Sequence, residues 1–179
     1  MQWREVHRWW LVAVAVVAVS LSGCRTEYHG YYADIDGVLW RQVAGFKDPL
    51  SQGLYRPSTV ELMQYLDELG GTRWDGTASS LADLQLEEGG VVLYDISSTD
   101  SVADVSFFIA SGPRPDVPSE EGFTYTGPSQ VFTCYGIEAH FDGEDPHFAS
   151  RKVFEECPSA LVALLPEDAA FASAEVFDG

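Results

Sequence analysis

Two carboxylates separated by one residue, Asp34 and Asp36, are the sharpest candidates for chemistry in this sequence. They lie in the stretch Asp34-Ile35-Asp36-Gly37-Val38-Leu39-Trp40. Extended or sharply turned backbone would present both side chains to one phosphoryl group, an arrangement that suits metal-assisted hydrolysis. The other interpretation is a turn at the start of the domain, in which Asp and Gly serve backbone geometry.

The same residues resemble the first motif of the haloacid dehalogenase-like phosphatases, Asp-x-Asp-Gly-x-Leu. The resemblance implies that Asp34 is the nucleophile and Asp36 the general acid/base, with Mg²⁺ held beside them. In that family a buried hydrophobic strand precedes the motif, whereas residues 27–33 here read Glu-Tyr-His-Gly-Tyr-Tyr-Ala. The family's later lysine context and acidic Gly-Asp motif are missing. We therefore favour the turn and keep the hydrolase as an alternative.

An acidic stretch near the middle of the second half could hold a cation. Its possible ligands are His140, Asp142, Glu144, Asp145 and His147. The spacing is not that of an EF-hand, and Gly143 and Pro146 suit the tip of a hairpin without any metal. We expect a solvated tip and no cofactor. Gly-x-Ser-x-Gly, His-Glu-x-x-His, phosphate-loop and dinucleotide motifs are all missing from the sequence.

The first 24 residues have the three-part pattern of an export signal. Arg4 and Arg8 precede an apolar run from Trp9 to Leu21, whose 13 residues are fewer than the roughly 20 of a spanning helix. Leu21-Ser22-Gly23-Cys24 then resembles the lipobox of bacterial lipoproteins. The resemblance implies a diacylglycerol on the Cys24 thiol, further acylation such as palmitate, and cleavage before Cys24. The alternative is an uncleaved transmembrane anchor.

The two other cysteines, Cys134 and Cys157, form an even pair, which in an exported domain indicates a disulfide. Residues 129–142 alternate as a strand, and residues 151–156 can return as its partner. If Asp142 lies opposite Ala149, antiparallel pairing places Cys134 opposite Cys157. A catalytic thiol or a metal-binding cysteine is the remaining alternative.

Acidic residues dominate the composition. Ten Lys and Arg face 28 Asp and Glu, a formal net charge of −18. Residues 1–23 carry a net of +1, so the chain from Cys24 onward carries −19. Such a surface repels phosphate backbones, which makes nucleic acid a poor partner, and it would leave an anionic membrane unless it were tethered.

The order of predicted elements favours a single small α+β domain with a mainly antiparallel sheet and one main helix. A capping box at Ser58-Thr59-Val60-Glu61 and apolar residues at helical spacing predict that main helix over 58–69. Strands are predicted over 90–96 and 102–110, an exposed loop over 111–122, and a short helix over 159–165. We expect a signal peptide with its helix at 1–23, a lipidated tether at 24–33 and the domain at 34–179.

These patterns together predict an extracytoplasmic lipoprotein, anchored to the cell membrane through lipid on Cys24. We expect its domain to bind or scaffold an unidentified envelope or extracellular ligand without catalysis. The alternative function is a metal-dependent, phosphatase-like hydrolase that uses Asp34 and Asp36.

Overall fold

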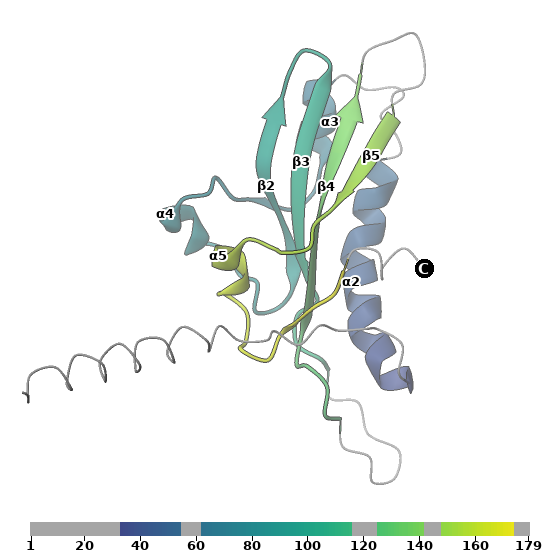
Figure 1. Cartoon of the computed structure of the whole chain (residues 1–179), viewed down its shortest axis with the longest axis vertical. Coiled ribbons are helices and arrows are strands. Elements are labelled where there is room, and N and C mark those ends of the chain that lie inside the picture. The colour runs from purple at the N-terminus through teal and green to yellow at the C-terminus, as the bar shows by residue number, and fades with distance from the viewer. Residues whose placement is uncertain (1–32, 55–61, 116–124, 142–147, 174–179) are drawn as a thin grey trace, which may run out of the picture.

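A mainly antiparallel sheet with helices on both faces forms the framework of the domain (Figure 1). The computed structural model describes residues 33–54, 62–115, 125–141 and 148–173. The helices are α2 (Ala33–Leu54), α3 (Leu62–Glu68), α4 (Ala78–Leu81) and α5 (Ser159–Val162). The strands are β1 (Thr72–Arg73), β2 (Gly90–Ser98), β3 (Val102–Ala110), β4 (Val131–His140), β5 (Phe148–Val153) and β6 (Ala170–Phe171).

The sheet runs in the order β1-β2-β3-β4-β5, and β6 pairs with β4 outside that path. Strands β2 to β5 form antiparallel neighbours, whereas the two-residue strands β1 and β6 pair in parallel. The predicted α+β class with a mainly antiparallel sheet is therefore confirmed. The predicted strands at 90–96 and 102–110 correspond to β2 and β3, and the short helix predicted over 159–165 is α5.

The main helix is α2, not the helix predicted over 58–69. Leu39, Val43, Phe46 and Leu50 recur at intervals of four, three and four residues, which places them on one face of a helix. That face packs against the sheet, and Leu39 and Val43 are completely buried. Within residues 58–69, the structure describes only the short helix α3 and the residue that follows it. No helix in the described ranges is long and apolar enough to cross a membrane.

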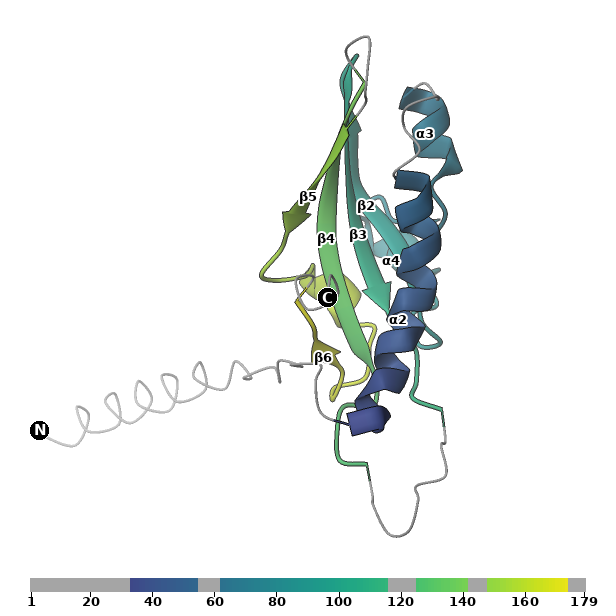
Figure 2. The ribbon, with the colours of Figure 1, turned by 90° about the vertical axis from the view of Figure 1, so that its right-hand side faces the viewer.

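Two hydrophobic clusters lie on opposite faces of the sheet. Helices α2 and α3 cover one face along its length, and Figure 2 shows them as a layer beside the strands. The second cluster lies beneath α4, α5 and the segments around them, which cover the lower half of the other face. Strand β4 contributes to both clusters, with Phe107 stacked on Tyr135 at 5.3 Å on the helical side and Phe108 on Phe132 at 5.6 Å on the other. The upper half of the second face has no described helix over it (Figure 1).

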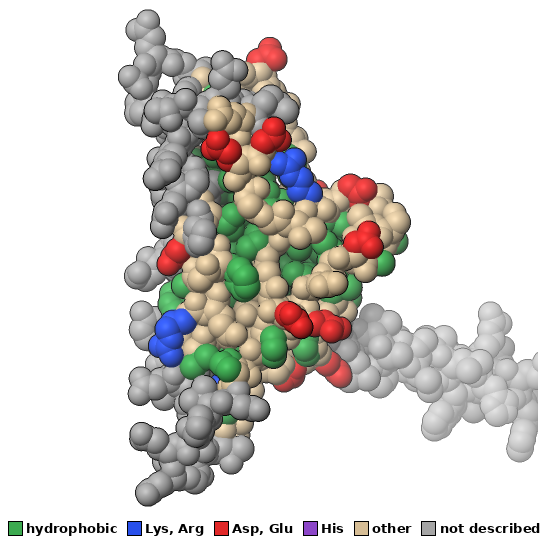
Figure 3. All heavy atoms as spheres, turned by 180° about the vertical axis from the view of Figure 1, so that it is seen from behind, with side chains coloured by type: hydrophobic (Ala, Val, Ile, Leu, Met, Phe, Trp, Pro, Cys, Tyr) green, Lys and Arg blue, Asp and Glu red, His purple; other side chains and the backbone are tan. Residues whose placement is uncertain are grey.

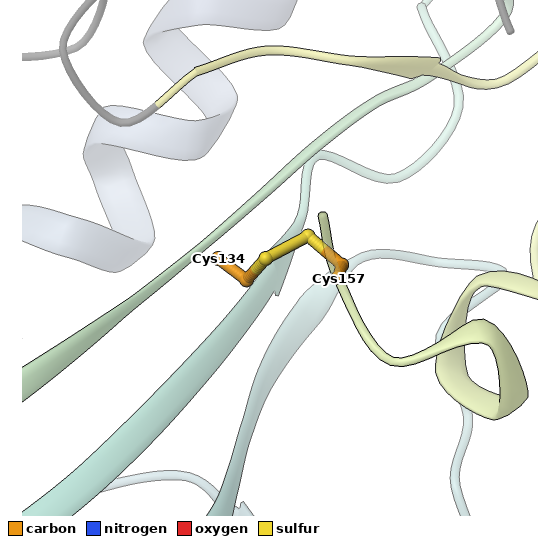
Figure 4. The surroundings of a disulfide bond; sticks show 2 residues. All are labelled: Cys134 and Cys157. Atoms are coloured by element: carbon orange, nitrogen blue, oxygen red, sulfur yellow. A yellow bond between two sulfur atoms is a disulfide. The ribbon is translucent and has the colours of Figure 1, made fainter. Parts of the chain in front are cut away.

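A disulfide joins Cys134 of β4 to Cys157, with 5.7 Å between the Cα atoms (Figure 4). The pairing was predicted correctly, but the register was not. Ala149 lies opposite Ala139 rather than Asp142, a shift of three residues, and the returning strand is 148–153 instead of 151–156. Cys157 therefore follows β5 and reaches back to β4 across the second hydrophobic cluster.

The start of the segment 111–122, which was expected to be an exposed loop, packs closely against neighbouring backbone. Ser111 is 2% exposed, and its hydroxyl accepts a hydrogen bond from the Val131 backbone N–H at 3.1 Å. Gly112 has a φ of 75°, and a Cβ there would lie 2.3 Å from the Glu88 carbonyl oxygen. Only glycine fits this approach, which holds the start of β2 against the end of β3.

We predict that Leu39→Ala lowers the free energy of unfolding by about 2–5 kcal/mol, because it leaves a cavity under α2. Gly45→Ala in the same helix should raise it by about 0.5–1 kcal/mol, because alanine restricts the unfolded chain and favours helix. Gly45 is exposed, and a Cβ there meets no atom within 4 Å. Urea unfolding of both variants checks this. Equal, small effects would contradict the placement of Leu39 in the core.

We predict that Cys134→Ser/Cys157→Ser lowers the free energy of unfolding by about 3 kcal/mol. The disulfide spans a sequence separation of 23 residues, and opening a loop of that size gives about this value in the chain-entropy model. Thermal melts with and without a dithiol reductant measure the effect. The double variant should match the reduced protein, and a double variant as stable as the oxidised protein would rule out a stabilising role.

Candidate functional site

A row of charged side chains crosses the uncovered upper half of the sheet. Its members are Asp104 of β3, Glu138 and His140 of β4, and Lys152 of β5, which we call the charged row. Asp104 lies directly opposite Glu138, and Lys152 opposite Gly136. Because side chains alternate between the two faces of a strand, this register brings all four to the face away from α2.

The ammonium of Lys152 connects the two carboxylates. It donates to Asp104 Oδ1 at 2.6 Å and lies 2.7 Å from Glu138 Oε2. The other carboxylate oxygen of Glu138 lies 2.8 Å from His140 Nε2. Two carboxylates facing each other across neighbouring strands repel. The lysine offsets that repulsion, so the three strands meet in one ion-pair network.

The side chains of the charged row are partly exposed to solvent, although they also form ion pairs and hydrogen bonds with one another. The side chains of Lys152, Asp104, Glu138 and His140 are 46%, 41%, 30% and 25% exposed. Hydrogen bonds from Lys152 and His140 hold the pKa of the Glu138 carboxyl below its ordinary value. Hydrogen bonds to Asp104 and Glu138 raise the pKa of Lys152. Both shifts move the pKa farther from pH 7, so the Glu138 carboxyl and the Lys152 ammonium keep their charges at that pH.

For Glu138 and Lys152, these charge states favour electrostatic binding over proton transfer. An efficient general acid or base has a pKa near the working pH, and an activated lysine nucleophile has a lowered one. The pKa of Glu138 is lowered and that of Lys152 is raised, so both shifts are opposite to those that such roles require. Glu138 and Lys152 therefore offer a fixed negative and a fixed positive charge to a ligand.

Aromatic side chains form the border between the row and the covered half of the face. The rings of Trp74 and Tyr94 lie 6.4 Å apart, and the Trp74 indole N–H donates to the Thr77 carbonyl at 3.0 Å. Burial raises the pKa of Tyr94 to about 12, so its phenol stays protonated. On the other side, the Phe154 ring lies over Gly136, where a Cβ would be 3.0 Å from Phe154 Cζ. Gly136 thus lets the segment after β5 pack on the sheet.

The structure separates the residues that the sequence analysis singled out. Asp34 and Asp36 belong to the first turn of helix α2, so the turn predicted there is wrong, and the motif lies on helical rather than on extended or sharply turned backbone. Asp142, Glu144, Asp145 and His147 lie outside the described residues, as does Cys24. His140 is at the end of β4 and belongs to the charged row. Among the described residues, no group of three or more His, Cys, Asp or Glu side chains could hold a metal ion.

Sequence reasoning missed Asp104, Glu138 and Lys152. A usable signal was present, because Glu138 and His140 occupy alternate positions of one strand and therefore share a face. Adding Lys152 required the register of β4 with β5. In the predicted register Lys152 would lie opposite Ala139 and point to the face of α2, since a shift by an odd number of residues exchanges the faces.

Comparison of the chain with protein-family models, curated proteins and solved structures gives no match. A function is therefore inferred from the chemistry of its own residues.

We predict that Lys152→Met raises the pKa of Glu138 toward its ordinary value, because the largest cause of its lowering is removed. A carboxyl with a lowered folded-state pKa stabilises the protein above its unfolded pKa, and that contribution is lost as the pH falls through the folded value. The acid side of the stability profile should therefore be shallower in Lys152→Met. Carboxyl ¹³C NMR titration measures the pKa, and urea unfolding between pH 3 and pH 7 measures stability.

Arg41→Met is the matched control, because it removes one positive charge from an exposed site on α2. It should leave the titration of Glu138 nearly unchanged. Equal shifts in both variants would mean that net charge, and not the contact with Lys152, sets the pKa of Glu138.

Proposed function

We propose that the protein is an exported lipoprotein, held on the extracytoplasmic face of the cell membrane by lipid on Cys24. Its domain binds a charged envelope or extracellular ligand through the charged row. The support at the N-terminal side is the pattern of Arg4 and Arg8, the apolar run to Leu21, and the lipobox that ends at Cys24. Two or more acyl chains on one protein give stable membrane anchoring, whereas one chain gives only reversible attachment.

The disulfide between Cys134 and Cys157 is the observation that carries this proposal. Disulfides form and persist in oxidising compartments and are rare in the cytosol. Cys134 is completely buried and lies within the second hydrophobic cluster, so the bridge belongs to the packed interior of the domain. A domain with such a bridge in its core would be stable in an oxidising compartment outside the cytoplasm.

The charged row supports binding rather than catalysis. The Glu138 carboxylate and the Lys152 ammonium stay ionised at neutral pH, and together with Asp104 they lie side by side on an open sheet face. The net charge of −18 disfavours nucleic acid as the ligand. Ligands that carry both a cationic and an anionic group fit this arrangement, because each finds an opposite charge within the row.

We predict that Cys24→Ala abolishes incorporation of labelled fatty acid, because it removes the acceptor thiol. The protein should then remain uncleaved or be shed into the medium. Metabolic labelling and membrane fractionation measure both outcomes. The matched control is Cys134→Ser/Cys157→Ser, which should still take up lipid because Cys24 is intact. Labelling that persists in Cys24→Ala would overturn the lipoprotein proposal.

A further inference from the structure

We infer that the domain has a preferred orientation on the membrane, with the end where α2 begins toward the bilayer and the charged row away from it. This inference rests on the proposed anchoring through Cys24. It identifies which end of the domain meets lipid and which surface is left for a partner outside the membrane.

Helix α2 begins beyond one end of the sheet. The side-chain amide of Gln42 donates to the Pro113 carbonyl at 3.1 Å, and Pro113 follows the last residue of β3, Ala110, by three positions. Gln42 is therefore level with the end of β3. Ala33 lies nine residues earlier, which at 1.5 Å per residue is about 13 Å further along the helix axis. Figure 2 shows this end of α2 at the bottom of the molecule.

The connection between the anchor and α2 is short. Residues 25–32 separate Cys24 from Ala33. At about 3.5 Å per residue, a fully extended chain of this length reaches about 30 Å. That reach is no longer than α2 itself, whose 22 residues extend about 33 Å. The lipid therefore keeps the start of α2 within about 30 Å of the bilayer, whereas the other end of the domain can lie farther away.

The charged row is at the opposite end of the sheet. His140 is the last residue of β4, and Asp104 is the third residue of β3, which begins at the end where β4 stops. Strand β3 has nine residues and extends about 30 Å. With the start of α2 near the membrane, the row lies on the half of the sheet farther from lipid.

Charge opposes a flat arrangement on the bilayer. The chain from Cys24 onward carries −19, and Figure 3 shows carboxylate side chains spread over the face that is hidden in Figure 1. Anionic lipid attracts basic segments and repels acidic ones within about 10 Å of the surface. Tipping the long side of the domain onto the membrane would bring these carboxylates into that layer, so repulsion favours the upright arrangement.

Energy transfer from two matched positions to the lipid surface tests the orientation. Glu88 precedes β2 at the end near the start of α2, and Asp100 lies in the turn between β2 and β3 at the other end. Both side chains are exposed, and replacing either removes one carboxylate. In separate full-length, lipidated variants, each position receives a genetically encoded amino acid that carries a donor dye. The protein is bound to phosphatidylcholine–phosphatidylglycerol vesicles with an acceptor dye on the headgroups.

Transfer from position 88 should be roughly twofold or more stronger than from position 100, because the two lie about 30 Å apart along the sheet. Equal transfer from both, or stronger transfer from position 100, would overturn the orientation while leaving the anchor intact, provided that the protein floats with the vesicles. Lipidated protein is identified beforehand by its mass. As a control, protein without lipid should not float with the vesicles. Absence of any lipidated species would overturn both the anchor and the orientation.

Discussion

Pairing of β4 on both of its sides is the constraint on which the rest of the structure depends. One side of β4 pairs with β3 along nine residues, and the other pairs with β5 over its upper part and with β6 at its lower end. Its side chains enter both hydrophobic clusters, and it carries Cys134 together with half of the charged row. A change in the register of this strand would therefore alter both cores, the disulfide and the row at once.

The strands could be predicted because their sequence signals are local. Residues 90–98, 102–110 and 131–140 are rich in β-branched and aromatic side chains, and each became a strand. The capping box at Ser58 predicts a longer helix than the short α3 that follows it, whereas the main helix α2 is indicated by the spacing of Leu39, Val43, Phe46 and Leu50. Short motifs are weak signals, whereas a repeated helical spacing over three turns reflects burial of a whole face.

The charged row could not be predicted because it depends on the pairing of distant strands. Reading the hairpin from the two cysteines gave a register three residues away from the observed one. The cysteines do not lie opposite each other in the ladder, since Cys157 follows the end of β5, in a segment whose Phe154 ring packs over Gly136 of β4. A disulfide limits the distance between two residues, and it leaves the register of the strands between them undetermined.

The disulfide also closes a covalent ring of which β5 is a part. Every peptide bond between Cys134 and Cys157 belongs to this ring, so a single protease cut there leaves one connected molecule instead of two fragments. The ring includes Glu138, His140 and Lys152, and the ladder of β4 with β5 would continue to hold them together after such a cut. A protease can thus cut the surface that carries most of the charged row without separating it from the domain.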